Sequence, residues 1–275
     1  MIGNAHAPLT VPGDRPERFA KATSSGADAV VIDLEDAVAP DAKGEARCAA
    51  LTYIASLDAA GRRRTGIRVN ALSTEAGLSD LLALRSTQLR PGFLVIPKVE
   101  ASAPLTFYAT HCENVDLLAT IESVAGLEAA SAIASAPNVR GLVFGGLDFS
   151  IETRAAFAWE PLLFARSTVV AAAATAGIAA FDVPFLDTSG CNGLAEEASR
   201  VRALGFTGKM TIHPRHVADV LAAFVPSQEQ VAHSRALLAA AAQASHGAFA
   251  FEGRMVDEPV LRNARRILHR AGREA

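Results

Sequence analysis

The sequence predicts an α/β protein folded as a TIM (β/α)8 barrel, and three observations support this class. Eight short runs rich in β-branched and aromatic residues recur along the chain, separated by stretches long enough for a crossover helix. The eight units fill roughly 215 residues, which suits one barrel. An open doubly wound sheet is the nearest alternative, but Val11-Pro12-Gly13-Asp14 is not the glycine-rich phosphate turn that such a sheet usually carries after its first strand.

The expected strands are short apolar runs, each followed by polar or turn residues. They cover residues 9–11, 29–33, 66–69, 93–96, 117–121, 141–144, 178–183 and 209–212. Amphipathic or alanine-rich stretches between them predict helices at residues 41–57, 75–85, 162–176 and 194–204. We expect a barrel over residues 1–225 and a C-terminal helical lid extension over residues 226–275.

Composition excludes several classes of partner. The chain has 275 residues, of which 50% are hydrophobic, so it can bury a large core in one domain. Its formal net charge is -3 and its basic residues are dispersed, which argues against nucleic-acid and anionic-membrane partners. The three cysteines, Cys48, Cys112 and Cys191, form no CxxC pair, and no signal peptide or membrane span is visible. These features predict a cytoplasmic protein.

Polar side chains follow most of the expected strands, at the end of a barrel where active sites are built. They are Asp33, Glu35, Asp36, Arg68, Asn70, Lys98, Glu100, Glu122, Asp148 and His213. Converging carboxylates repel one another, so such a group usually holds a cation or is neutralised by basic side chains. Oxygen ligands without paired cysteines or an HExxH helix favour Mg²⁺. The alternative is that Asp36 and Asp148, each just before a helical stretch, cap helices.

Eight motifs in order resemble those of one known family, from about residue 10 to about residue 268. They are VPGDRPERFAKA, VVIDLEDAV, RVN, IPKVE, ATIES, VFGGLDFS, GFTGKMTIHPRHV and FEGRMVDEPV. On these motifs the chain is similar to the citrate lyase β-subunit-like branch of the HpcH/HpaI aldolase superfamily, which includes malyl-CoA and citramalyl-CoA lyases. The resemblance implies a TIM barrel holding Mg²⁺, or Mn²⁺ in its place, through two carboxylates.

Residue by residue, the resemblance identifies Glu122 and Asp148 as the metal ligands. It places Glu35 and Asp36 around the metal, hydrogen-bonded to its waters and to basic side chains. It matches Arg68 to an arginine facing the reacting oxygen of the substrate. Local alternatives are a plain helix-start glutamate for Glu122 and a surface salt bridge for Arg68.

The same motifs imply that Arg68, Lys98, Gly145 and Gly146 bind substrate. Lys98 either balances the carboxylates or acts as a Schiff-base amine. We favour charge balance, because a metal-assisted aldolase needs no imine.

The activity implied is Mg²⁺-dependent carbon-carbon cleavage, or formation, of a 3-hydroxy-3-carboxyacyl-CoA thioester such as malyl-CoA or citramalyl-CoA. The products would be a 2-oxo acid and an acyl-CoA. Alternatives are a citryl-acyl-carrier-protein lyase subunit of a citrate lyase complex, a class II aldolase for 2-oxo acids and aldehydes, and a non-catalytic subunit. The chain after His213 exceeds the one helix that completes a barrel, which favours the thioester branch.

Asp257 lies in the final motif, before a helical stretch that contains Pro259. Its local pattern is that of a helix N-cap. The resemblance implies instead a general base on a C-terminal lid, reaching the active site of a neighbouring subunit. We therefore expect a homo-oligomer, most simply a trimer, in which Asp257 acts in trans.

Overall fold

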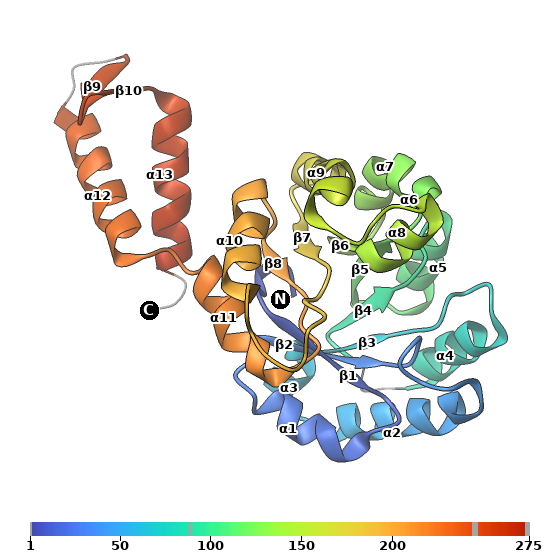
Figure 1. The fold of residues 1–275 in the computed structure, drawn as a ribbon. Coiled ribbons are helices and arrows are strands. Elements are labelled where there is room, and N and C mark those ends of the chain that lie inside the picture. Colours follow the sequence, from blue (N-terminus) through green and yellow to red (C-terminus); the bar gives the residue numbers. More distant parts are fainter. Residues whose placement is uncertain (1, 88–89, 244–246, 273–275) are drawn as a thin grey trace. The chain divides into compact units, whose positions relative to one another are not determined.

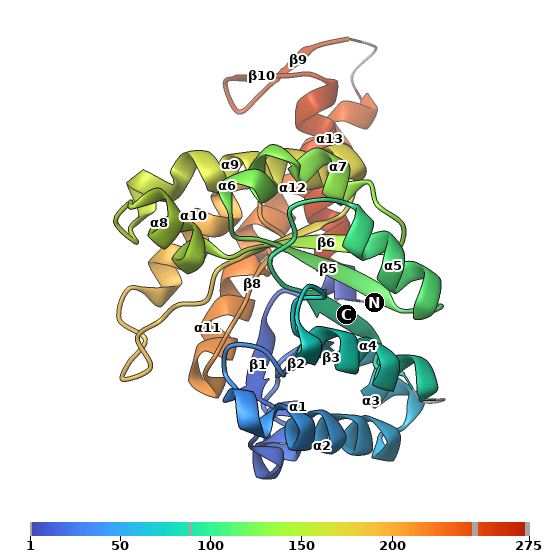
Figure 2. The same ribbon diagram turned by 90° about the vertical axis from the view of Figure 1, so that its right-hand side faces the viewer.

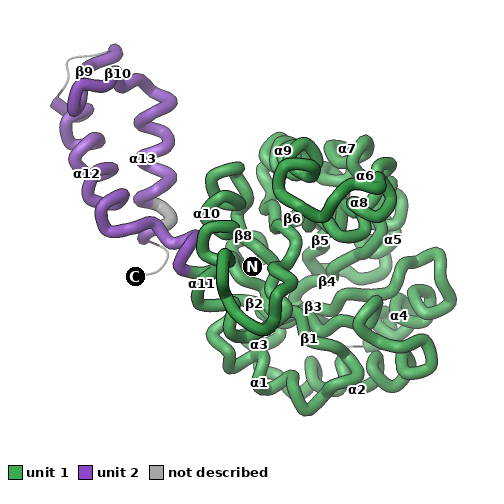
Figure 3. Tube along the Cα trace, viewed as in Figure 1, with its two compact units in different colours: residues 1–221 green, residues 222–275 purple. Residues whose placement is uncertain are grey.

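The computed structural model describes residues 2–87, 90–243 and 247–272. It divides into two compact units, Met1–Leu221 and Ala222–Ala275, which are described separately (Figure 3). The boundary predicted from the sequence, after residue 225, lies a few residues later. The observed division falls inside the helix α11 (Pro214–Phe224).

The first unit is a barrel of eight parallel strands in sequence order (Figure 1). Its strands are β1 (Pro8–Pro12), β2 (Ala29–Asp33), β3 (Thr65–Arg68), β4 (Phe93–Ile96), β5 (Asp116–Ile121), β6 (Val139–Phe144), β7 (Ala179–Asp182) and β8 (Gly208–Lys209). The chain just after β8 closes the barrel on β1, because Thr211 N donates to Pro8 O at 2.8 Å and Thr10 N donates to Thr211 O at 2.8 Å. The predicted TIM barrel is confirmed.

Helices surround the strands of this unit (Figure 2). They are α1 (Phe19–Thr23), α2 (Lys43–Ser56), α3 (Ala59–Arg64), α4 (Glu75–Ser86), α5 (Ala103–His111), α6 (Val124–Glu128), α7 (Ala130–Ala134), α8 (Gly146–Thr153), α9 (Trp159–Ala176), α10 (Leu194–Leu204) and α11, with short 3₁₀ turns η1 (Ile2–Asn4), η2 (Pro16–Arg18) and η3 (Pro40–Ala42). Helix α4 begins where the Thr74 hydroxyl accepts the Gly77 N–H at 3.0 Å, and α9 ends at Gly177 with φ 67°.

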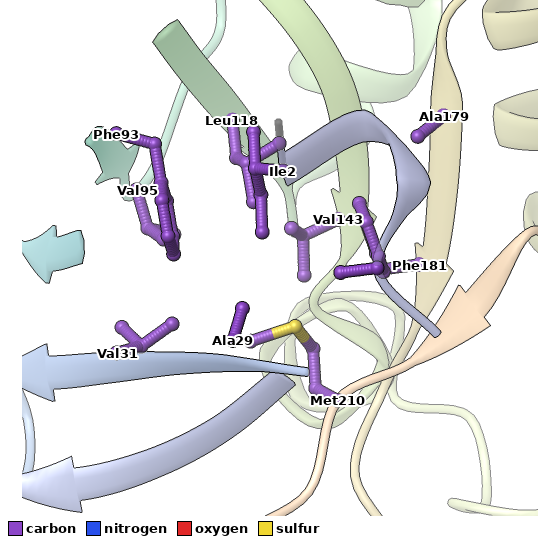
Figure 4. Packing of buried hydrophobic residues seen from close by; sticks show 11 residues of the cluster. Ile2, Ala29, Val31, Phe93, Val95, Leu118, Val143, Ala179, Phe181 and Met210 are labelled. Carbon is purple, nitrogen blue, oxygen red and sulfur yellow. The ribbon is translucent and has the colours of Figure 1, made fainter. Parts of the chain in front are cut away.

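Alternate strand residues fill the barrel interior with apolar side chains. Figure 4 shows Val31, Val95, Leu118, Val143 and Met210 among the residues that point toward one another there. Because side chains alternate along a strand, the next inward position is two residues further on. On β5 this step leads from Leu118 to Thr120 and then to Glu122, and on β2 it leads from Val31 to Asp33.

The second unit consists of two helices and a hairpin. Helices α12 (Gln228–Gln243) and α13 (Glu258–Ala271) flank the antiparallel strands β9 (Phe249–Phe251) and β10 (Arg254–Val256). The turn between these strands has positive φ at Glu252 and Gly253, 48° and 75°, as a two-residue hairpin turn with right-handed twist requires. A small core of Leu237, Val256 and Ala264 holds the unit together; Leu238, Phe249, Phe251 and Leu261 pack against it.

None of the helices described is both long and apolar enough to span a bilayer.

Candidate active site

Polar side chains on or just after β1, β2, β3, β5 and β6 line a cavity of about 240 Å³ at the carboxyl ends of the strands. We call it the strand-end cavity. Its polar lining includes Thr10, Asp36, Arg68, Thr120, Glu122 and Asp148. A larger hollow of about 850 Å³ lies at the amino-terminal ends of the strands, but barrel enzymes build their sites at the carboxyl ends. The strand-end cavity is therefore the candidate active site.

Arg68, at the end of β3, is fixed by a buried carboxylate on β2. Its Nε and Nη2 donate to Asp33 Oδ1 and Oδ2 at 2.7 and 2.5 Å, and its Nη1 lies 3.0 Å from Glu35 Oε2. Burial alone would lower the pKa of Arg68, but these carboxylates outweigh it and raise that pKa. The guanidinium is thus a permanent cation with fixed orientation, and part of its five-donor set remains for a ligand.

Lys98 follows β4 and places both its ammonium and its backbone among carboxylates. The Nζ donates to Glu35 Oε1 at 2.5 Å and lies 3.4 Å from Asp36 Oδ1. Burial would lower the pKa of Lys98, yet the hydrogen bond and charge of Glu35 raise it well above its usual range. A Schiff-base lysine needs a lowered pKa. The observed geometry therefore fits the charge-balancing role better.

Glu122 follows β5 directly and is 7% exposed. Its Oε1 accepts the backbone N–H of Lys98 at 2.5 Å, which Lys98 can present because its φ is 52°. Burial, together with the charges of Glu35 and Asp148, raises the pKa of Glu122 to about 7, although the Lys98 N–H opposes the rise. A bound cation would relieve this unfavourable burial of negative charge.

Gly145 is required by the position of Glu122. A Cβ on Gly145 would lie 2.4 Å from Glu122 Cβ and 2.6 Å from Glu122 Oε2, so Glu122 would have to shift to make room for it. Gly146 is buried, and a Cβ there would lie 2.8 Å from the ring of Phe144. Of the two glycines, only Gly145 lines the strand-end cavity.

Asp148 sits in the first turn of α8, and its carboxylate has no hydrogen-bond or ion-pair partner within the described part of the chain. The helix is capped by Gly145, without a side-chain bond, so Asp148 does not serve as its cap. Asp36 is likewise no helix cap, because its carboxylate faces Lys98 and Arg68. The helix-cap alternative for these two residues is therefore wrong.

Asp257 lies in the second unit, immediately before α13. Its Oδ1 accepts the Val260 N–H at 3.4 Å, a long N-cap bond that leaves the carboxylate free for other partners. Both interpretations of Asp257 are compatible with this local geometry.

Two residues of the site, Asp33 and Thr120, were not predicted from the sequence. Asp33 was only one member of an acidic run, whereas it is the buried anchor of Arg68; the inward alternation of Ala29 and Val31 is the signal that points to it. Thr120 carried no signal beyond its spacing from Glu122, yet its side chain reaches the strand-end cavity.

The side chains present fit a hard divalent cation held by two carboxylates. Among the described residues, no group of three or more His, Cys, Asp or Glu side chains has the geometry of a metal cage. Mg²⁺ does not need one, because it usually binds one or two carboxylates and completes its shell with waters and substrate oxygens. Glu122 and Asp148 line the same cavity and are close enough for the charge of Asp148 to raise the pKa of Glu122.

The chain is similar to known proteins along most of its length. Residues 7–214 match the HpcH/HpaI aldolase/citrate lyase family. The chain belongs to this family. A citrate lyase subunit beta-like protein of Mycobacterium tuberculosis is 39% identical over 271 residues, covering 96% of this chain and 94% of the relative. The mitochondrial citramalyl-CoA lyase of Homo sapiens is 32% identical over 280 residues, covering 93% and 82%.

The family assignment extends to solved structures. The crystal structure of the protein CitE from Mycobacterium tuberculosis, in complex with magnesium, acetoacetate and coenzyme A, superimposes with a TM-score of 0.86. It is 37% identical and covers 98% of this chain and 99% of its own. As an HpcH/HpaI family member, the chain thus shares its fold with a protein whose crystal structure contains magnesium, acetoacetate and coenzyme A.

Proposed function

We propose that the protein is a Mg²⁺-dependent carbon-carbon lyase that converts a 3-hydroxy-3-carboxyacyl-CoA thioester into a 2-oxo acid and an acyl-CoA. The single observation that carries this proposal is the meeting of Glu122, Asp148 and the anchored Arg68 in one cavity. The relatives support it: one binds magnesium, acetoacetate and coenzyme A, and another is a citramalyl-CoA lyase.

Glu122 and Asp148 would hold the cation, with Mn²⁺ able to replace Mg²⁺. Bound there, the metal supplies Lewis acidity to the carbonyl oxygen of the 2-oxo acid. Glu122 is held ready for this by the Lys98 N–H and by the space that Gly145 leaves. Glu35 takes the charge of Lys98, so the ammonium does not compete as a partner of Glu122.

Arg68 would donate to the reacting oxygen, which is a hydroxyl in the thioester and a carbonyl in the oxo acid. Between these states the oxygen carries negative charge, and a guanidinium fixed by Asp33 needs no reorganisation to meet it. Charge that develops there is stabilised more than charge in the ground state, which is the condition for catalysis.

Helix α8 would orient the carboxylate of the oxo acid. Its first turn carries Gly146, Leu147 and Asp148, whose N–H groups have no hydrogen-bond partner in the described structure. The cap residue Gly145 brings no side chain that would occupy them. Such a helix start favours an anionic group.

Asp257, contributed by a neighbouring copy in a homo-oligomer, would act as the general base. It removes the proton of the hydroxyl; the bond between the hydroxyl-bearing carbon and the carbon next to the thioester breaks, and the oxygen becomes a carbonyl. The electron pair leaves as a thioester enolate, which takes up one proton and becomes the acyl-CoA. The family resemblance at FEGRMVDEPV motivates this assignment.

A substrate panel tests the proposal. Purified protein with Mg²⁺ is given malyl-CoA, citramalyl-CoA and related thioesters, and the released oxo acid is measured; glyoxylate or pyruvate with acetyl-CoA is run in reverse. We expect cleavage that Glu122→Gln abolishes and Glu100→Gln leaves intact, since Glu100 is exposed and does not line the cavity. Cleavage of acyl-carrier-protein thioesters alone, or of no thioester, would contradict the proposal.

A further inference from the structure

One side of the strand-end cavity is apolar and comes from the last two strands. Val183, Pro184 and Leu186 follow β7, Met210 and Ile212 follow β8, and all five line the cavity. We call these five residues the apolar wall. The polar lining, including the proposed metal ligands, comes from other elements. Placing a carboxylate against hydrocarbon carries a large desolvation cost, so the apolar wall suits the hydrocarbon part of a substrate.

The part of the apolar wall that follows β7 has a single hydrogen-bonding anchor. Residues 183–193, between β7 and α10, belong to no helix or strand (Figure 1). Residues 183–186 make one hydrogen bond within the described structure, in which the Lys209 Nζ donates to Val183 O at 2.6 Å. The four side chains of this stretch carry no polar atoms and cannot supply another.

The ammonium of Lys209 is completely buried and fully paired. Lys209 and Asp182 are each 0% exposed, and the Nζ lies 3.1 Å from Asp182 Oδ2 and 2.6 Å from Glu197 Oε1. With the Val183 carbonyl, these acceptors match the three donors of an ammonium. Because desolvation offsets much of the attraction in a buried ion pair, the pair is weak evidence of a role in stability. The bond to the lining of the cavity indicates another role.

We propose that Lys209 is a positioning residue, which holds the apolar wall in place through its bond to Val183 O. This inference rests on the proposed function and adds a residue to the same site, although Lys209 itself does not line the cavity. Without this bond, residues 183–186 would adopt several arrangements, of which one forms the wall. Binding then weakens in proportion to the fraction of molecules that carry the formed wall, while the bound complex is unchanged.

Lys209→Met removes the bond to Val183 and fills the same space with a flexible apolar side chain. For the thioester that the native protein cleaves, KM should rise by about tenfold or more, the loss expected for a hydrogen bond from a charged donor. The value of kcat should stay within about twofold of native, as for any loss of uniform binding. Mg²⁺ affinity should not change, because Glu122 and Asp148 lie on other elements. General damage to the barrel would lower kcat and Mg²⁺ affinity as well.

Asp182→Asn is the control that separates the bond to Val183 from the ion pair. It removes the buried negative charge beside Lys209, whereas the Nζ keeps Val183 O and Glu197 as acceptors. This variant should retain the native KM. An equal rise of KM in Asp182→Asn and Lys209→Met would show that the ion pair holds the wall, and it would overturn the inference. A native KM in folded Lys209→Met would overturn it too.

A double variant covers the case in which Lys209→Met does not fold. Lys209→Met combined with Asp182→Asn removes both charges of the pair, and Arg166, which donates to Asp182 at 2.8 Å, can still donate to the asparagine. Its KM should rise as expected for Lys209→Met. If the double variant does not fold either, Lys209 is required for folding, and its assignment as a positioning residue is wrong.

Chymotrypsin provides a measurement that does not depend on activity. It cleaves after Phe185 and Leu186 once these residues leave the barrel, at a rate that follows the population of the open form. Mass spectrometry should show cleavage there about tenfold faster in Lys209→Met and at the native rate in Asp182→Asn. If it does but the native protein cleaves no thioester, the lyase proposal fails and Lys209 still holds the wall. If thioesters are cleaved and neither KM nor this cleavage changes, only the inference fails.

Discussion

At the scale of single residues, the site is built from paired charges whose roles differ by burial. Asp33 is fully buried and holds the arginine, and Glu35 is shared between Arg68 and Lys98. Glu122 is buried, and no cationic side chain of the described residues forms an ion pair with it. Of these three carboxylates, only Glu122 lacks a cationic partner that would balance its charge. The sequence pattern located all three carboxylates. It could not show which of them is paired with a cation, because pairing and burial depend on contacts between different strands.

Arg68→Lys keeps the positive charge but removes the guanidinium whose orientation Asp33 fixes. Lysine cannot reproduce the paired bonds to Asp33, so the cation should lose its orientation toward the reacting oxygen. We expect kcat to fall by about 10²-fold, with Mg²⁺ affinity nearly unchanged. Steady-state kinetics and Mg²⁺ titration of the same preparation provide the comparison. An unaltered kcat in a folded variant would remove Arg68 from the mechanism.

Glu122 makes the response to Mg²⁺ depend on pH. Its pKa is raised from 4.5 to about 7 in the folded protein, so ionised Glu122 costs stability, and this cost appears as pH rises through the interval from 4.5 to 7. Mg²⁺ relieves the cost only where Glu122 is ionised. Saturating Mg²⁺ should therefore raise the melting temperature more at pH 8 than at pH 5.5. Glu122→Gln should lose most of that difference, and an equal shift at both pH values would count against Glu122 as ligand.

At the scale of elements, hydrophobic periodicity predicted the eight barrel strands but not the exact end of β8 or the hairpin β9–β10. All eight expected strands occur, because a strand buried on both faces leaves a short apolar run. The eighth is shorter than expected, Gly208–Lys209 in place of residues 209–212, since Thr211 meets β1 through an isolated bridge. The hairpin β9–β10 was not expected, although Phe249 and Phe251 alternate, because three-residue strands fall below what periodicity resolves.

One methyl group added at Gly145, between β6 and α8, should weaken Mg²⁺ binding. Gly145→Ala places a Cβ against Glu122 and should displace its carboxylate. We expect Mg²⁺ affinity to fall by about tenfold or more, the effect of disturbing a ligand's support, while circular dichroism still reports a folded barrel. Gly44→Ala in α2 is the matched control, because a Cβ there meets no atom within 4 Å. Native Mg²⁺ affinity in Gly145→Ala would show that Glu122 is not the ligand.

At the scale of the whole molecule, the barrel and the second unit carry different parts of the proposed chemistry. The barrel supplies Glu122, Asp148 and Arg68, which line one cavity and which the proposal assigns to charge stabilisation. The proposed reaction also needs a carboxylate that is free to accept a proton. The resemblance at the motif FEGRMVDEPV implies that this carboxylate is Asp257 in the second unit. If Asp257 serves a neighbouring copy, each active site draws on two chains, and the homo-oligomer is a condition of activity.

Subunit mixing tests this arrangement. Asp257→Ala and Glu122→Ala should each be inactive as homo-oligomers, since one lacks the base and the other a metal ligand. After exchange of subunits in equal amounts, a site is complete when its barrel comes from the first variant and its Asp257 from the second. Random assembly makes this combination in about a quarter of the sites, so activity should return to about a quarter of the native value. Mixing Asp257→Ala with an Asp257→Ala, Glu122→Ala double variant is the control and should stay inactive. If the complementary mixture also stays inactive although mass spectrometry shows mixed oligomers, Asp257 does not act across a subunit boundary.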